Sequence, residues 1–280
     1  MSYSMISVSR LLEAFGNYGN PLEILVKRRW SREHEVIRVV DRRSGVAVRC
    51  KLAAHRMFGE VWFDHDYEVP GVPLRRGDVV IDIGGNQGFY TCYAAWQGCW
   101  VYTFEPDREN FTLLEANVRS NGFADRVKLL PMAVKLTSGA VQLFRTDKLG
   151  GGMHTTNREF AKHQGISVND AVEVTAMTLP ELFGSEKLER VRLCKMDCEG
   201  AELEILQSLT AAEAARVDAF ALEFHPDAYP PTRLVEVIES WGTHHIFAAA
   251  PKYYCQRDIL YAVTKLALRE TMQIQAGRDR

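Results

Sequence analysis

This sequence has no Cys-x-x-Cys pair, little net charge and no long apolar run. Its six scattered cysteines do not support a structural zinc site, and buried free thiols are their expected state. The formal net charge of −2 gives no electrostatic reason to expect nucleic acid or an anionic membrane as a partner. No apolar run approaches the roughly eighteen residues that indicate a membrane span, and residues 1–10 lack a signal-peptide pattern. The expected compartment is therefore the cytoplasm.

What is present is the composition of an ordinary globular protein, with 46% hydrophobic and 25% charged residues. A chain of 280 residues holds one large α/β domain or a domain with an extension. We expect residues 1–75 to form an N-terminal extension packed on the core and residues 76–280 to form the main domain. A short basic run, Lys27-Arg28-Arg29, is interpreted as a solvated helix end.

The extension contains two recognisable patterns. Residues 9–28 read as a helix that begins at an N-cap Ser9 and is interrupted between Gly16 and Pro21. Residues 35–40 and 46–52 flank a short polar turn with a glycine and predict a β-hairpin. The aromatic and acidic stretch that follows, residues 58–73, has no clean period.

From Asp78 onward, apolar strands alternate with helical patterns, which predicts βαβ units and a parallel sheet. The expected strands lie at 78–83, 100–105, 126–132, 191–197, 217–224, 244–250 and 258–265, and the expected helices at 88–97, 108–120, 179–184, 200–208 and 231–241. The last two strands are joined by residues 251–257, too few for a helical crossover, so we expect them to pair antiparallel.

The alternation fails between residues 134 and 178. Short strand-like segments at 141–144 and 172–174 surround the loop Gly150-Gly151-Gly152. We expect this insertion to act as a lid over a site.

The most informative stretch is a strand, a glycine turn and a helix over residues 79–91. The strand ends in Asp82, and Gly84 and Gly88 let the backbone pass close to a ligand. The helix that starts near Gly88 offers backbone amides to polar groups. Glu105 ends the next strand, about twenty residues beyond the glycines, where an acid grips ribose hydroxyls. The unit predicts a nucleoside-binding site.

Two details favour S-adenosylmethionine over NAD as the nucleoside. The NAD fingerprint has a glycine that admits the pyrophosphate, and this chain has Asn86 there. Asp82 would repel a diphosphate but suits the ammonium group of S-adenosylmethionine. An NAD-linked oxidoreductase and a non-catalytic nucleoside-binding partner of another enzyme remain the alternatives.

A second cluster of reactive side chains, Cys194–Glu202, lies where the fourth parallel strand ends. Ligands of open α/β sheets bind beyond the carboxyl ends of the strands, so Asp197 should face the same crevice as Asp82 and Glu105. Asp197 is our first candidate for a general base. The alternative is that Asp197 or Glu199 only caps the following helix.

Two histidines and a group of aromatic residues are further candidates. His225, at the end of the fifth strand, is the second candidate base. The alternative is that this histidine, which precedes a proline, only satisfies backbone groups. His154 lies beside the triple glycine and could enter the site from the lid. Trp62, Phe63 and Tyr67 either wall the methionine end of the cofactor or pack the extension onto the sheet. The other histidines show no metal-ligand spacing, so we expect no metal.

The motifs together resemble those of the FkbM family of methyltransferases. The matching segments are DIGGNQGFYT (82–91), FEPD (104–107), Asn110, Asn117, KMDCEGAE (195–202) and EFH (223–225). The resemblance covers roughly residues 75–225. The chain departs from the family at Gly85, where alanine is usual, at Cys198, where an aliphatic residue is usual, and at Pro180, where the family often has aspartate.

The resemblance implies a Rossmann-like class I methyltransferase fold. We therefore expect a mostly parallel seven-stranded sheet with the last strand antiparallel, helices on both faces, and the N-terminal extension with its hairpin. The implied activity is O-methylation of a small hydroxylated acceptor, a sugar or natural product, with S-adenosylmethionine as cofactor. The expected cofactor-binding residues are Asp82, Gly84, Asn86, Gly88, Glu105, Pro106 and Ala133. The acceptor and the oligomeric state have no readable motif.

Overall fold

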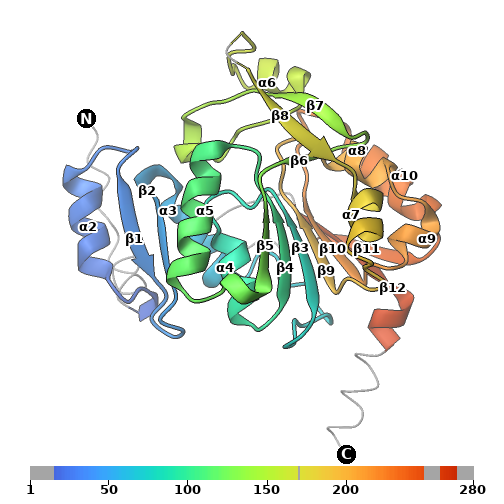
Figure 1. The fold of residues 1–280 in the computed structure, drawn as a ribbon, viewed down its shortest axis with the longest axis horizontal. Helices are drawn as coiled ribbons and strands as arrows, with labels where there is room; N and C mark the ends of the chain where they lie inside the picture. The colour runs from blue at the N-terminus through green and yellow to red at the C-terminus, as the bar shows by residue number, and fades with distance from the viewer. Residues whose placement is uncertain (1–15, 170, 249–258, 270–280) are drawn as a thin grey trace, which may run out of the picture.

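A seven-stranded sheet forms the centre of the molecule (Figure 1), in a computed structural model that describes residues 16–169, 171–248 and 259–269. Its strands run in the spatial order β11 (His244–Ala248), β12 (Ile259–Thr264), β10 (Ala219–Glu223), β9 (Leu193–Met196), β3 (Val79–Ile83), β4 (Trp100–Phe104) and β5 (Val127–Leu130). Neighbouring strands from β10 to β5 are parallel, whereas β12 is antiparallel to both β10 and β11. The predicted fold class is confirmed.

Alternate side chains of each strand point to opposite faces of the sheet, and each face is buried in its own core cluster. Val80 and Val101 belong to one core cluster and Ile81 and Phe104 to the other. The central strand β9 is buried at every position. This explains why the strands read as continuous apolar runs in the sequence.

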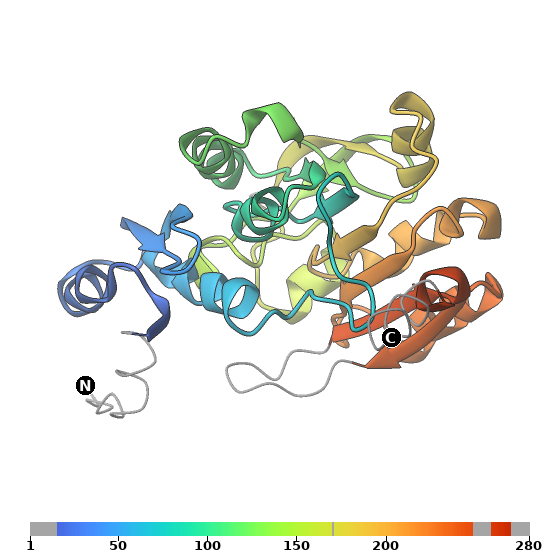
Figure 2. The same ribbon diagram turned by 90° about the horizontal axis from the view of Figure 1, so that it is seen from below.

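Helices cover both faces, as expected. On one side lie α4 (Phe89–Trp96) and α5 (Arg108–Ser120), and on the other α7 (Leu179–Ser185), α8 (Glu202–Gln207) and α10 (Pro231–Ser240), with the short α9 (Ala211–Ala214) between the last two (Figure 2). α5 has the predicted bounds because Asp107 caps it: the carboxylate accepts hydrogen bonds from the backbone amides of Glu109 and Asn110.

The extension confirms the predicted hairpin and adds a helix that was missed. β1 (Val36–Val40) and β2 (Ala47–Lys51) pair antiparallel, and α2 (Pro21–Trp30) carries the basic run in its last turn. After the 3-10 turn η1 (Leu52–Ala54), α3 (His55–Trp62) was not predicted. Its apolar positions Phe58, Val61 and Trp62 follow a helical spacing over only one turn, too short a pattern to stand out.

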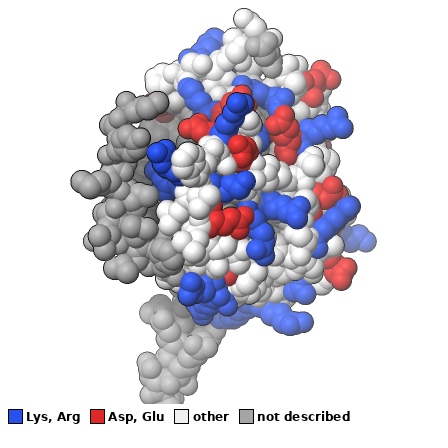
Figure 3. All heavy atoms as spheres, turned by 90° about the vertical axis from the view of Figure 1, so that its left-hand side faces the viewer, with Lys and Arg blue, Asp and Glu red and all other residues white. Residues whose placement is uncertain are grey.

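The surface on the extension's side of the molecule mixes both signs of charge. Lys and Arg side chains lie next to Asp and Glu side chains across it (Figure 3). This distribution agrees with the near-zero formal net charge of the chain.

Buried asparagines join the extension to the core. The Asn117 side-chain amide donates to the carbonyls of Arg49 and Gln87, and its oxygen accepts from the Arg49 amide at 2.7 Å. Asn121 binds both backbone groups of Ala47 in the same way. The edge of β2 therefore has its hydrogen-bond partners on α5, and the extension shares the core cluster of α4 and α5.

The 134–178 region forms a second, three-stranded sheet above the carboxyl end of the main one. β8 (Val172–Met177) lies between β6 (Ala133–Val134) and β7 (Gly139–Leu143), which confirms strand structure at 141–144 and 172–174. The short helix α6 (Arg158–His163) and the turn η3 (Lys148–Gly150) complete it. α6 was not predicted, because its six residues carry too few apolar positions.

Several expectations fall on parts of the chain outside the described residues. Ser9, the start of the predicted helix at 9–28, the connection 251–257 and Cys255 are among them. The five other cysteines are unpaired thiols. Within the described part of the chain, helices are too short or too polar to cross a membrane.

Replacing Asn117 by alanine should destabilise the protein by about 2–3 kcal/mol. The substitution leaves the amide and carbonyl of Arg49 and the carbonyl of Gln87 without their partner in a buried setting. Urea unfolding measures the change. Arg119→Ala, on the exposed side of the same helix, is the control and should cost less than about 0.5 kcal/mol. Equal effects of the two substitutions would contradict this account of how the hairpin is held.

Candidate active site

A cavity of about 570 Å³ opens at the carboxyl ends of β3, β4 and β9. Six of the predicted site residues line it: Gly84, Asn86, Glu105, Pro106, Ala133 and Asp197. The insertion covers part of it through Gly151, Gly152, His154 and Thr156. Segments far apart in the sequence therefore meet at the edge where the topology predicted a ligand site.

The glycine turn after β3 requires glycine for a steric reason. Gly84 has φ of +79°, and a Cβ there would lie 1.8 Å from the carbonyl oxygen of Asp197. The turns that follow β3 and β9 thus touch through their backbones. A Cβ on Gly85 would lie 2.3 Å from Oγ1 of Thr103, which explains glycine where the family usually has alanine.

Gly88 has a packing role in the structure. It caps α4 with φ of +90°, and a Cβ there would lie 2.9 Å from Cδ1 of Leu114 on α5. Its contact is with the neighbouring helix, so it supports the turn from behind.

Glu105 is fixed at the wall of the cavity. Its two oxygens accept hydrogen bonds from the backbone amides of Asn86 and Asp107, each at 2.8 Å. Burial raises the pKa of Glu105 to about 8, against the opposing effect of these amides. Each carboxylate oxygen has a second lone pair, so the group retains capacity to accept hydroxyl hydrogen bonds from a ligand.

Asp82 does not take the place expected for it. Its side chain is fully buried, with Oδ1 3.2 Å from the ammonium of Lys195 and Oδ2 accepting from the Thr91 hydroxyl at 2.6 Å. Lys195 also donates to the carbonyls of Ile83 and Gly84. The expected contact with a ligand ammonium is therefore made by the protein's own lysine, and Asp82 shapes the turn from beneath.

A smaller cavity of about 350 Å³ adjoins the first across Gly84 and Asn86. It is lined by α3, Tyr67, Lys195 and Asp197. The Tyr67 hydroxyl lies 3.0 Å from Oδ2 of Asp197 and 2.8 Å from Oε2 of Glu223. Among the aromatic residues predicted to lie at the methionine end of the cofactor or in the packing of the extension, Tyr67 contacts the site residues, whereas Trp62 stacks on Phe58 in the core.

His225 lies between two carboxylates. Nε2 is 3.2 Å from Oε2 of Glu199, and Nδ1 is 3.2 Å from Oε1 of Glu202. Burial lowers the pKa of His225, but the two glutamates outweigh burial and raise it to about 12. An imidazole that stays protonated at neutral pH cannot accept a proton from a substrate, so the environment disagrees with the expected role of His225 as a base.

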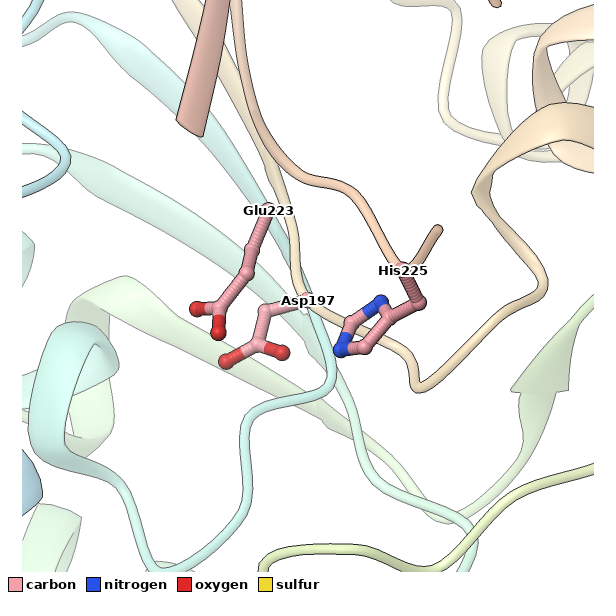
Figure 4. Close-up of side chains that lie close together, drawn as sticks. All are labelled: Asp197, Glu223 and His225. Atoms are coloured by element: carbon pink, nitrogen blue, oxygen red, sulfur yellow. The ribbon is translucent and has the colours of Figure 1, made fainter. Parts of the chain in front are cut away.

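Asp197, Glu223 and His225 point toward one another (Figure 4), and their nearest ligand atoms lie within 4.8 Å. Such a group is close enough to hold a metal ion. The coordinating atoms are already engaged, however: both ring nitrogens of His225 face glutamates, and the two carboxylates share the Tyr67 hydroxyl. We assign no metal to this group, and the expectation of none stays a prediction.

The insertion is held over the larger cavity by amide side chains. Gln87 donates to the carbonyl of Gly150, and Asn110 donates to the carbonyl of Gly151. The oxygen of Gln87 accepts from the Lys51 amide of the extension. Gln87 therefore ties the glycine turn to both other parts of the chain, a role that its place in the motif did not reveal.

His154 reaches the cavity from the insertion, as considered in the sequence. Its side chain is only 7% exposed, and Nδ1 accepts from the amide of Thr146. Nε2 is therefore the protonated nitrogen of the neutral ring, and it lies 3.7 Å from Oδ1 of Asp107. Burial lowers the pKa of His154, which favours the neutral ring.

The family described as "Methyltransferase FkbM domain" matches residues 82–252. Two curated proteins illustrate the similarity. The 31-O-demethyl-FK506 methyltransferase FkbM of Streptomyces tacrolimicus is 26% identical over 194 residues, covering 61% of this chain and 75% of that protein. The hexuronic acid methyltransferase AglP of Haloferax volcanii is 26% identical over 153 residues, covering 55% of this chain and 58% of that protein.

Among solved structures, a methyltransferase FkbM from Methylobacillus flagellatus KT has a similar fold. It superposes with a TM-score of 0.50 at 13% sequence identity and covers 91% of this chain. This chain spans 58% of the length of that one. At this identity the likeness concerns the fold alone.

Replacing Gly84 by alanine should destabilise the protein far more than the same change at another left-handed glycine. Gly165 has φ of +64° with open space around its Cα, so Gly165→Ala costs only the backbone strain, about 1–2 kcal/mol. Gly84→Ala must also separate the β3 and β9 turns, which should add about 2 kcal/mol or more. Urea unfolding of both variants measures the difference, and similar values would refute the close contact of the two turns.

Proposed function

Because this chain belongs to the FkbM family of methyltransferases, we propose that it transfers a methyl group from S-adenosylmethionine to a hydroxyl group of a sugar or natural product. One observation carries the proposal: the larger cavity lies over the Gly84 turn with Glu105 on its wall and Asp197 at its border with the smaller cavity. Family membership favours methyl transfer over the NAD-linked alternative. The names of the two curated relatives motivate the choice of acceptor.

The residues present fit the proposed cofactor. Glu105 offers lone pairs to ribose hydroxyls, and Pro106, Ala133 and Phe104 offer an apolar surface to an adenine ring. Asp197 supplies negative charge where the smaller cavity meets the larger, which suits a sulfonium or an ammonium group. Glu223 lies behind it and shares the Tyr67 hydroxyl with it. When bound, S-adenosylmethionine supplies an electrophilic methyl group. Asp197 and Glu105 hold and orient it, and the buried turn beneath keeps their spacing fixed.

The acceptor would enter from the side of the insertion. The loop of Gly151 and Gly152 and the segment after Asp197 border the same cavity, so an acceptor there would lie close to the carboxylates of Asp197 and Glu199. Both carboxylates can receive a hydroxyl proton, and Asp197 stays a candidate base.

S-Adenosylhomocysteine, the proposed product, should bind the wild-type protein in a calorimetric titration. Above pH 8, where Glu105 is ionised, Glu105→Gln should weaken the binding roughly ten- to hundredfold, because one charged hydrogen bond to the ligand contributes about 1.5–3 kcal/mol. Glu115→Gln on α5 is the control and should bind as the wild type does. No heat with the wild-type protein would end the proposal.

Methyl transfer is tested with methyl-labelled S-adenosylmethionine and a panel of hydroxylated acceptors. The panel contains hexuronic acids and hydroxylated polyketides, chosen from the names of the relatives. We expect label in the acceptor as an O-methyl ether by mass spectrometry and NMR. Label on nitrogen or carbon in place of oxygen would contradict O-methylation while leaving methyl transfer intact.

We also propose that the 134–178 insertion acts as a lid that Gln87 latches. Gln87→Ala removes the bond to Gly150 and should speed trypsin cleavage after Lys148 or Arg158. S-Adenosylhomocysteine should slow cleavage of the wild-type protein at the same sites. Limited proteolysis followed by mass spectrometry measures both rates, with Gln97→Ala, on α4's far end, as the control. Unchanged rates in the Gln87 variant would contradict the latch.

A further inference from the structure

Three side chains form a chain from the core to the larger cavity: Glu202, His225 and Glu199. Glu202 is fully buried and fixed by the Tyr229 hydroxyl at 2.8 Å and by the amides of Cys198 and Gly200. It holds Nδ1 of His225, and Nε2 of His225 in turn faces Glu199. Each member thus orients the next, and the last one borders the cavity.

Glu199 is held in its place by an unusual backbone conformation. Its φ is +54°, a left-handed backbone conformation that is energetically unfavourable for any residue other than glycine. The insertion supports the conformation: the Thr155 hydroxyl donates to the Glu199 carbonyl at 2.6 Å, and the Asn157 amide donates to the Gly200 carbonyl at 2.9 Å. A helix cap requires neither this backbone conformation nor these hydrogen bonds from the insertion. The alternative that Glu199 only caps the following helix therefore does not explain them.

Resting on the proposed methyl transfer, we propose that Glu199 is the general base of the reaction and that His225, held by Glu202, is its positioning residue. The acceptor O–H bond breaks as its proton passes to the Glu199 carboxylate. The acceptor oxygen forms the new bond to the methyl carbon, and the electron pair of the carbon–sulfur bond stays on sulfur, which becomes a neutral thioether. Glu199 then returns its proton to solvent.

The surroundings separate Glu199 from Asp197, the first candidate of the sequence. Asp197 is engaged by the Tyr67 hydroxyl and lies 4.0 Å from the Lys195 ammonium, which suits a fixed negative charge. Burial raises the pKa of Glu199 to about 7. The facing groups act in both directions: His225 lowers this pKa, while Asp197 and Glu223 raise it. A base with a pKa near the working pH is suited to proton transfer.

The titration of Glu199 can be measured without an acceptor. In protein labelled with carbon-13 at the glutamate carboxyls, the NMR signal that disappears in Glu199→Gln is assigned to Glu199. We expect it to titrate near pH 7 in the wild type and at a pH higher by about one unit or more in His225→Gln, because the cation that lowers its pKa is gone. His163→Gln, an exposed histidine on α6, should leave it unchanged.

A Glu199 signal that titrates like an exposed glutamate, or that does not move in His225→Gln, would overturn the assignment. This measurement stands apart from the proposed function, which fails only if the wild-type protein binds no S-adenosylhomocysteine or transfers no methyl group.

Turnover gives a second test, with methyl-labelled S-adenosylmethionine and the acceptor that accepts label in the screen. Glu199→Gln should lower kcat about 10²- to 10⁴-fold while its affinity for S-adenosylhomocysteine stays within roughly twofold of the wild type. In His225→Gln, the acidic limb of the pH profile should move to higher pH. Full activity of Glu199→Gln beside an inactive Asp197→Asn would make Asp197 the base. Activity lost with EDTA and restored by Mn²⁺ would also overturn the inference.

Discussion

The site depends on two cations that hold a group of carboxylates together: Lys195, which is buried, and His225, which is partly buried. Lys195 lies among Asp82, Asp197 and the carbonyls of the glycine turn, and His225 lies between Glu199 and Glu202. Burial disfavours the charged form of Lys195, but the Asp82 and Asp197 carboxylates outweigh burial and raise its pKa. A buried pair of this kind is costly to break, because removal of one partner leaves an unpaired charge, about 3–5 kcal/mol. The positions of the turns after β3 and β9 follow from these pairs and from the backbone contact at Gly84.

The acids also differ in position according to the cation with which they pair. Asp82, paired with Lys195, supports the turn under the cavity, and Asp197 lines the cavity itself. Of the two acids paired with His225, Glu202 is buried in the core and Glu199 borders the cavity. The oxygens of Glu105 are held by backbone amides, and burial raises its pKa to about 8 although the charge of Lys195 acts in the opposite direction. Carboxylates of the same residue type therefore differ in pKa and in charge because their partners differ. Such differences allow one edge of a sheet both to hold a cofactor and to accept a proton.

Much of the fold could be predicted because its determinants are local. Apolar strands with turn signals between them predicted the sheet. The helical pattern predicted α5 at its observed bounds, and the structure shows that Asp107 caps it. Several cavity residues after β3, β4 and β9 could be predicted, because the glycine turn and the acids lie at strand ends that the topology brings to one edge. α3 and α6 could not, because one or two turns carry too little periodicity.

The partner of Asp82 lies far along the chain in Lys195, and only the folded arrangement shows that this lysine takes the place expected for a ligand ammonium. The glutamates on both sides of His225 could not be predicted for the same reason. The sequence placed His225 at the end of the fifth strand, and only the folded structure shows that its ring nitrogens face Glu199 and Glu202.

We propose that a sulfur nucleoside binds over the Gly84 turn, between Glu105 and Asp197. A crystal structure of the protein with S-adenosylhomocysteine would show whether it does. We expect ribose hydroxyls within hydrogen-bond distance of Glu105 and the sulfur beside Asp197, under the loop of Gly151 and Gly152. A nucleoside bound elsewhere, or a cavity that stays empty at saturating ligand, would rule out this binding mode.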